Sequence, residues 1–132
     1  MPIRYTFDLA KRLVISTWTG PVTATDLDTL WSAYMAAPEF ARCDGSLADV
    51  RLAQIQFTGR ELSDRMKSLA IPAVGPRPFA AAVLVASPAQ YGSARQHGVF
   101  ASYTTMIFHE EEAALAWLET QVSLLRRDSG SR

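Results

Sequence analysis

Two short stretches of the sequence, Val22-Thr23-Ala24-Thr25-Asp26-Leu27 and Phe57-Thr58-Gly59-Arg60-Glu61-Leu62, share one pattern. Each has an apolar residue, a threonine, two further residues, an acidic residue and a second apolar residue. Such a threonine caps a helix, the acidic side chain reaches back to the threonine backbone N–H, and the apolar pair forms a hydrophobic staple. Glu61 completes a full capping box, and Asp26 forms a version with a shorter side chain. The two stretches predict two strand-to-helix junctions in an α/β sandwich whose loops gather at one end.

The composition is typical of one soluble globular domain. Of the 132 residues, 48% are hydrophobic and 20% are charged, which suffices to bury a core. The 13 basic and 13 acidic residues cancel, so neither nucleic acid nor an anionic membrane surface is an expected partner. The longest apolar run, Phe79–Ala86, is too short to span a bilayer. Because Cys43 is the single cysteine and no N-terminal signal stretch is present, we expect a cytoplasmic location.

Hydrophobic periodicity predicts the order of the elements. Alternating or β-branched segments predict strands, and apolar residues three and four apart predict helices. The expected elements are strand Ile3–Phe7, strand Leu13–Trp18, a helix from Thr23 that Pro38 closes, strand Gly45–Val50, a helix from Thr58, strand Phe79–Ala86, a helix from Ser87 to about Ala101, strand Thr104–Phe108 and a helix after Glu110. Strands joined through helices run parallel, whereas the first two form an antiparallel hairpin. The fold class is therefore an α/β sandwich, ββαβαβαβα, with a mixed, mostly parallel five-stranded sheet and about four helices.

The chain shows no internal domain boundary. Residues 1–125 are expected to form a single domain, and residues 126–132, which are polar and contain Gly and Ser, a flexible C-terminal tail. Pro72, Gly75, Pro76 and Pro78 predict a stiff, non-helical connection after the second helix.

Four strings occur in an order that resembles the STAS/SpoIIAA-like family, relatives of the bacterial anti-sigma-factor antagonists. They are Gly20-Pro21-Val22-Thr23, Ala48-Asp49-Val50-Arg51, Tyr91-Gly92-Ser93-Ala94-Arg95 and Phe108-His109-Glu110-Glu111-Glu112-Ala113-Ala114-Leu115-Ala116-Trp117-Leu118. The likeness covers about Ile3 to Leu124 and is closer to a small stand-alone bacterial branch, which is also linked to lipid-carrier domains of the SEC14 type. The resemblance implies a SpoIIAA-like sandwich and a non-enzymatic regulatory or binding module.

The resemblance draws attention to Thr58. Antagonists of the sigma-factor type carry a phosphorylatable serine at the start of their second helix, in an Asp-Ser-Ser-Gly-like loop. Thr58 occupies the hydroxyl position here, but the preceding acid is replaced by Phe57. A structural cap accounts for Thr58 without a kinase. A phosphosite at Thr58 is the alternative, since a phosphate would be favourable at a helix N-terminus.

Ligands of open parallel sheets bind beyond the carboxyl ends of the strands, which makes the residues there the candidate site. The candidates for ligand or partner binding are Asp49, Arg51, Thr58, Ser87, Tyr91, Arg95 and His109. The functional interpretations of Asp49 are a general base or an anion-repelling gate. In the structural alternative, Asp49 hydrogen-bonds neighbouring backbone or pairs with Arg51. Tyr91 and Arg95, one helical turn apart, either hold a carboxylate or phosphate or pack along the sheet.

No pattern in the sequence requires a metal or another cofactor. His97 is expected to be exposed and His109 to lie on the surface or at a helix cap, and neither belongs to a metal-binding motif. Ser93 lacks the flanking glycines of a nucleophile elbow. No catalytic residue is therefore assigned.

Three hypotheses follow from the sequence. The first is a non-enzymatic module that binds a protein partner or a small apolar or anionic ligand, with a homodimer as a further expectation. The second is a carrier of a lipid-like molecule, which requires an apolar pocket of roughly 300 Å³ or more. The third, an enzyme that uses Asp49, Tyr91 and Arg95, requires these three side chains to converge on one cleft.

Overall fold

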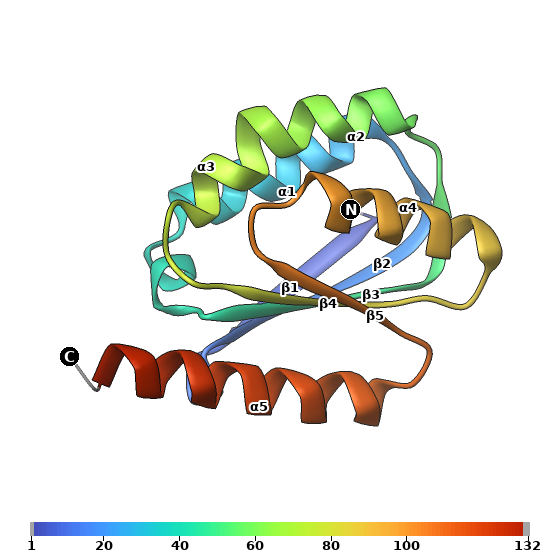
Figure 1. The fold of residues 1–132 in the computed structure, drawn as a ribbon. Coiled ribbons are helices and arrows are strands. Elements are labelled where there is room, and N and C mark those ends of the chain that lie inside the picture. The colour runs from blue at the N-terminus through green and yellow to red at the C-terminus, as the bar shows by residue number, and fades with distance from the viewer. Residues whose placement is uncertain (1, 131–132) are drawn as a thin grey trace.

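Five strands form one sheet in the order β1-β2-β3-β4-β5 (Figure 1). The computed structural model describes residues 2–130. The strands are β1 Ile3–Asp8, β2 Leu13–Val22, β3 Gly45–Ile55, β4 Ala80–Leu84 and β5 Thr104–Phe108. Strand β1 is antiparallel to β2, and every other neighbouring pair is parallel. The predicted mixed, mostly parallel sheet with one antiparallel strand is confirmed.

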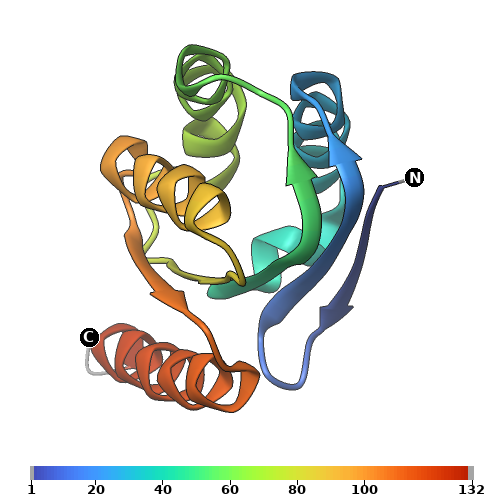
Figure 2. The same ribbon diagram turned by 90° about the vertical axis from the view of Figure 1, so that its right-hand side faces the viewer.

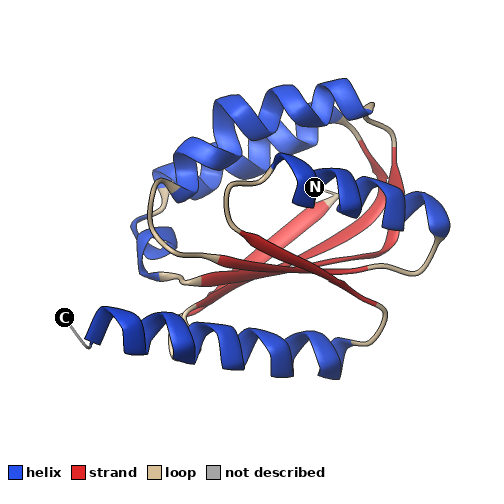
Figure 3. Ribbon diagram, in the orientation of Figure 1, coloured by secondary structure: helices blue, strands red, loops and turns tan. Residues whose placement is uncertain are grey.

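Helices cover both faces of this sheet (Figures 1 and 2). One face, called the α1 face, carries α1 Ala24–Ala36, α2 Gly59–Arg65, η2 Met66–Ala70, α3 Ile71–Val74 and α4 Pro88–Phe100. The opposite face, called the α5 face, is covered by α5 Glu111–Gly130. A short 3-10 helix, η1 Pro38–Arg42, leads into β3. The alternation of helices and strands follows the predicted order (Figure 3).

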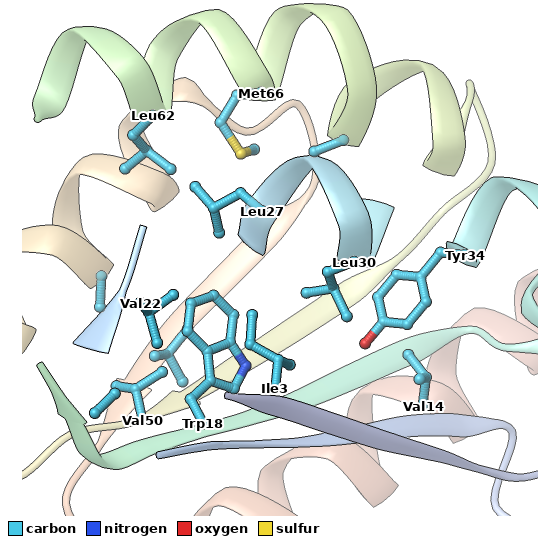
Figure 4. Close-up of a cluster of buried hydrophobic side chains, with 14 of the residues drawn as sticks. Ile3, Val14, Trp18, Val22, Leu27, Leu30, Tyr34, Val50, Leu62 and Met66 are labelled. Atoms are coloured by element: carbon cyan, nitrogen blue, oxygen red, sulfur yellow. The ribbon is translucent and has the colours of Figure 1, made fainter. Parts of the chain in front are cut away.

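Strand β4 shows why this sheet needs two helical layers. All five of its residues are buried, because both of its faces are covered. Ala80, Ala82 and Leu84 pack with Leu118 of α5. Val83 faces the larger core on the other side, which also contains Trp18, Leu27, Leu30, Leu62 and Met66 (Figure 4). The continuous apolar run in the sequence is thus explained by a central strand.

Both predicted capping boxes are present. The Thr58 hydroxyl oxygen accepts a hydrogen bond from the Glu61 backbone N–H at 3.1 Å, and Glu61 Oε1 accepts one from the Thr58 N–H at 2.9 Å. At the start of α1, Asp26 Oδ2 accepts a hydrogen bond from the Thr23 N–H at 2.8 Å. The reciprocal bonds at Thr58 and the Asp26 bond at Thr23 satisfy backbone groups that have no partner inside the helix.

Replacing Thr58 with alanine is expected to lower the free energy of unfolding by about 1 kcal/mol, because a helix N–H loses its acceptor. Urea denaturation would measure the change. The Thr58→Ser variant is the matched control, since serine caps equally well and should behave as wild type. Equal losses in the two variants would contradict the capping role.

The predicted non-helical connection at Pro72 is wrong. The helix that starts at Gly59 continues to Val74 through η2 and α3, and Pro72 lies inside it. Residues 66–70 form a wide π-helical turn in which the Ile71 N–H donates to the Met66 carbonyl oxygen. Such a turn relieves the crowding that a proline ring causes in an α-helix. The helix ends at Gly75, whose φ of +70° suits glycine.

Two element ends also differ from expectation. Strand β3 continues past Val50 to Ile55, beyond an irregularity in its pairing with β2 between Thr17 and Thr19. Helix α5 continues to Gly130, although a tail was expected from Arg126. Residues 131 and 132 lie outside the described residues, and flexibility of the terminal segment stays a prediction. No helix within residues 2–130 is long and apolar enough to cross a membrane.

Candidate functional site

A cavity of about 90 Å³ lies between the α1 face of the sheet and helices α1, α2, η2 and α4. Its floor contains small side chains of three adjacent strands, next to the larger Trp18, Val50 and Val83. The small floor residues include Ser16 of β2, Ser46 and Ala48 of β3 and Ala81 of β4. Its walls include Leu27, Leu30 and Trp31 of α1, Leu62, Arg65 and Met66 of α2 and η2, and Ser93, Ala94 and His97 of α4. Figure 4 shows Leu27 and Leu30 of α1 and Leu62 and Met66 of α2 and η2 above Trp18 of the sheet.

The cavity exists because the small residues are neighbours in the sheet. Ser46 pairs with Ala81, and Ala48 pairs with Ser16 on its other side. Side chains of this size do not reach the helices above them. Ser46 and Ala48 are only half-buried although they lie on the central strand, whereas Leu47 between them is buried against α5. Solvent therefore reaches the middle of the sheet from the α1 face.

Among the residues that the structure describes, Arg65 is the one permanently charged residue that lines the cavity. Its Nε donates to Asp28 Oδ1 of α1 at 3.0 Å, and a terminal nitrogen donates to Oδ2 at 3.4 Å. The hydrogen bond with Asp28 raises the pKa of the guanidinium, which stays charged. The Arg65 and Asp28 side chains are 27% and 43% exposed. The ion pair therefore spans α1 and α2 at the solvent-accessible rim of the cavity.

His97 and Tyr103 form a polar pair within the cavity wall. The Tyr103 hydroxyl and His97 Nε2 are 2.9 Å apart. His97 Nδ1 is buried and has no hydrogen-bond partner in the part of the chain that the structure describes. Burial lowers the pKa of His97 to about 4, so the imidazole is neutral at pH 7, and burial raises the pKa of Tyr103.

The expectation that His97 is exposed is therefore wrong. His97 lies seven residues after Gln90 and three after Ala94, on the buried side of α4. This spacing places the three residues on one helical face. Gly92 and Gly98 in the same stretch made this helical spacing hard to recognise in the sequence.

Gln90 is a buried polar residue that the sequence did not single out. Its Oε1 accepts a hydrogen bond from the Ala86 N–H at 2.7 Å, and its Nε2 donates to the Ala53 carbonyl at 2.8 Å and the Arg51 carbonyl at 3.2 Å. The start of α4 is thereby tied to the carboxyl end of β3. Ser87 caps the same helix, because its hydroxyl accepts from the Gln90 N–H at 3.2 Å. Both polar atoms of the Gln90 side chain therefore bind backbone groups, and Gln90 has a structural role.

The structure does not bring together Asp49, Tyr91 and Arg95, the three residues of the enzyme hypothesis. Asp49 binds Arg51 through two hydrogen bonds of 2.9 and 2.8 Å, which lower the pKa of Asp49. Asp49 is two residues after Leu47, so it lies on the α5 face. Tyr91, which is 44% exposed, and the exposed Arg95 lie on α4, on the opposite side of the sheet. The three side chains therefore do not converge on one cleft, as the enzyme hypothesis requires.

The other predicted site residues lie beyond the carboxyl ends of the parallel strands. Thr58 follows β3, Ser87 follows β4 and His109 follows β5. Thr58 and His109 are exposed, and Ser87 is half-buried. None of the candidates named from the sequence lines the cavity. No group of three or more potential metal ligands occurs among the described residues.

This arrangement of sheet and helices has solved counterparts. The structure is similar to that of an uncharacterized protein of the DUF3478 family from Shewanella loihica PV-4, described as having a SpoIIAA-like fold, with a TM-score of 0.63 over 88% of this chain and 93% of that chain. The chain has a SpoIIAA-like fold. The sequence identity to this protein is 15%, which shows a common fold alone. The fold that the sequence resemblance implied is therefore confirmed.

A second counterpart of the SpoIIAA-like fold is the anti-sigma factor antagonist SpoIIAA in its unphosphorylated form. It has a TM-score of 0.55 and 12% sequence identity, over 88% of this chain and 96% of that chain. No protein-family model matches the sequence, and no curated protein matches it significantly.

Proposed function

We propose that the protein is a non-enzymatic binding module that holds one small, ring-sized molecule in the cavity on the α1 face. The observation that carries this proposal is an apolar, partly aromatic cavity that is accessible to solvent. Small-molecule sites are typically concave and apolar, with a few polar groups that orient the ligand. Polar groups of this kind in the lining include Arg65, Ser93 and the His97–Tyr103 pair.

The volume limits the size of the ligand. A water molecule needs roughly 10–15 Å³ of such space, so about 90 Å³ holds several water molecules or one ring-sized compound. Pockets for larger ligands start at roughly 300 Å³. At about 90 Å³, the cavity is smaller than the roughly 300 Å³ that a lipid-like ligand requires. The hypothesis of a lipid carrier is accordingly not favoured.

Filling the cavity provides the test. The Ala48→Leu variant adds apolar atoms to the cavity floor, and it is expected to abolish binding while raising the free energy of unfolding by about 1 kcal/mol. Benzyl alcohol is the probe, and its binding is followed by tryptophan fluorescence, since Trp18 and Trp31 line the cavity. We expect a saturable change in wild type.

The matched control for this test is Ala116→Leu, which places the same extra atoms on the exposed side of α5. The control should bind benzyl alcohol as wild type does. The proposal fails if wild type shows no saturable response to benzyl alcohol or to a charged ring of similar size, or if Ala48→Leu responds as wild type does.

Protein docking is the second candidate function. It is supported by the similarity of the fold to SpoIIAA, an anti-sigma factor antagonist, although a fold alone does not determine function. The exposed start of α2 would be the contact. A phosphate on Thr58 would lie close to the Glu61 carboxylate that binds the Thr58 N–H, and like charges repel. Absence of a Thr58 phosphopeptide after purification from the native host would remove the phosphorylation switch.

Self-association and a bacterial cytoplasmic location stay predictions. Leu52 and Val99 are exposed apolar side chains, 74% and 73% accessible, and such residues are common at subunit contacts. Sedimentation that shows only monomer at high concentration would remove the homodimer.

A further inference from the structure

We infer that the cavity prefers a ring compound that carries one negative charge, such as a small aromatic carboxylate, and that Arg65 binds its anionic group. This inference rests on the proposed function, because it requires a ligand in the cavity. It adds the chemical class of the ligand and assigns the residue that selects it.

The charge of the cavity supports an anion. Arg65 is the permanent charge in the lining, and the second basic residue there, His97, is neutral at pH 7 because burial lowers its pKa to about 4. Among residues 2–130, no aspartate or glutamate lines the cavity. An anionic group on a ligand would therefore meet one cation within the lining, whereas the acids that act on Arg65, namely Asp28, Glu61 and Asp64, lie outside the lining.

The guanidinium of Arg65 can bind a ligand carboxylate in place of Asp28. Two of its N–H groups bind Asp28, whereas a guanidinium carries further donors in the same plane. A carboxylate suits this planar fork. Asp28 is nearly half exposed, so it can turn to solvent at small cost when a ligand replaces it, since surface ion pairs contribute little to stability. Asp28 therefore competes with the ligand for Arg65.

The remaining lining suits an uncharged ring. Aromatic and aliphatic side chains surround the space, and the residues of this kind nearest in sequence to Arg65 are Leu62 and Met66. Aromatic rings in the lining pack favourably against a planar ligand in edge-to-face or offset geometry. Trp18, Trp31, Tyr34, Phe57 and Tyr103 supply these rings. A compact ring with one acidic substituent suits both the apolar lining and the Arg65 cation within about 90 Å³.

The experiment compares benzoate with benzyl alcohol, which has a similar size and no charge, at pH 7 by tryptophan fluorescence and calorimetry. Wild type is expected to bind benzoate at least tenfold more tightly. In Arg65→Met, which keeps an apolar stem, this preference should disappear because a charge-assisted hydrogen bond is lost. In Asp28→Asn, benzoate should bind several-fold more tightly than in wild type, because its competitor is gone.

The outcomes separate the two proposals. Equal binding of the two probes by wild type, or an unchanged benzoate preference in Arg65→Met, overturns the inference and leaves the cavity as a site for neutral rings. Binding of neither probe overturns the proposed function itself. Circular dichroism of each variant verifies the fold, and Asp28→Asn tests the competition even where Arg65→Met is unstable.

Discussion

Replacing Leu118 with alanine is expected to lower the free energy of unfolding by about 3–4 kcal/mol. Leu118 is 0% exposed and lies on α5, which covers one face of the sheet (Figure 2). Its neighbours on that face include Leu13, Leu47 and Leu84. Removing the side chain leaves a cavity that these strand residues cannot fill, because they are fixed in a hydrogen-bonded sheet. Thermal or urea unfolding would measure the loss.

The matched control is Leu124→Ala on the same helix. Leu124 is 47% exposed, so its truncation is expected to cost well below 1 kcal/mol. Losses of equal size in the two variants would mean that α5 does not pack on the sheet as the structure places it.

Acidification is expected to destabilise the protein between pH 6.5 and about 4 through His97. Burial lowers the pKa of His97 from 6.5 to about 4, so the unfolded chain takes up a proton at His97 in this range and the folded chain does not. Unfolding is therefore favoured progressively as the pH falls, by up to about 3 kcal/mol for such a difference. Above pH 6.5 the imidazole is neutral in both states and contributes no pH dependence.

The His97→Gln variant isolates this effect. Glutamine does not titrate, so the variant is expected to lose less stability than wild type between pH 6.5 and 4. Urea denaturation at a series of pH values provides the comparison. Asp49, whose pKa lies below the usual carboxyl value, loses its contribution at lower pH in both proteins. Identical pH profiles of the two proteins would contradict the burial of a neutral imidazole.

Local patterns predicted the fold well where one physical effect dominates. The threonine and acid of each capping box determine the start of α1 and α2, and the apolar run of β4 reflects a strand covered on both faces. The pattern failed at Pro72, because a π-helical turn accommodates the proline within the helix. A wide turn depends on packing along the whole helix, which no short sequence window reveals.

The cavity was not predictable in the same way. It results from Ser46, Ala48 and Ala81 being adjacent across β3 and β4, and this adjacency depends on strand register. The rule that ligands bind beyond the carboxyl ends of strands directed attention to Thr58, Ser87 and His109 instead. Of the signals available, the spacing of Gln90, Ala94 and His97 on α4 would have identified part of the wall.

The most direct test of the central claim is a methyl NMR titration of the wild-type protein with benzoate. The proposed site predicts saturable shifts of the Ala48 and Ala81 methyl signals and nuclear Overhauser contacts from these methyl groups to the benzoate ring, with the Ala114 methyl signal on the α5 face unchanged. No saturable shift, or contacts confined to the α5 face, would contradict a ligand site in this cavity.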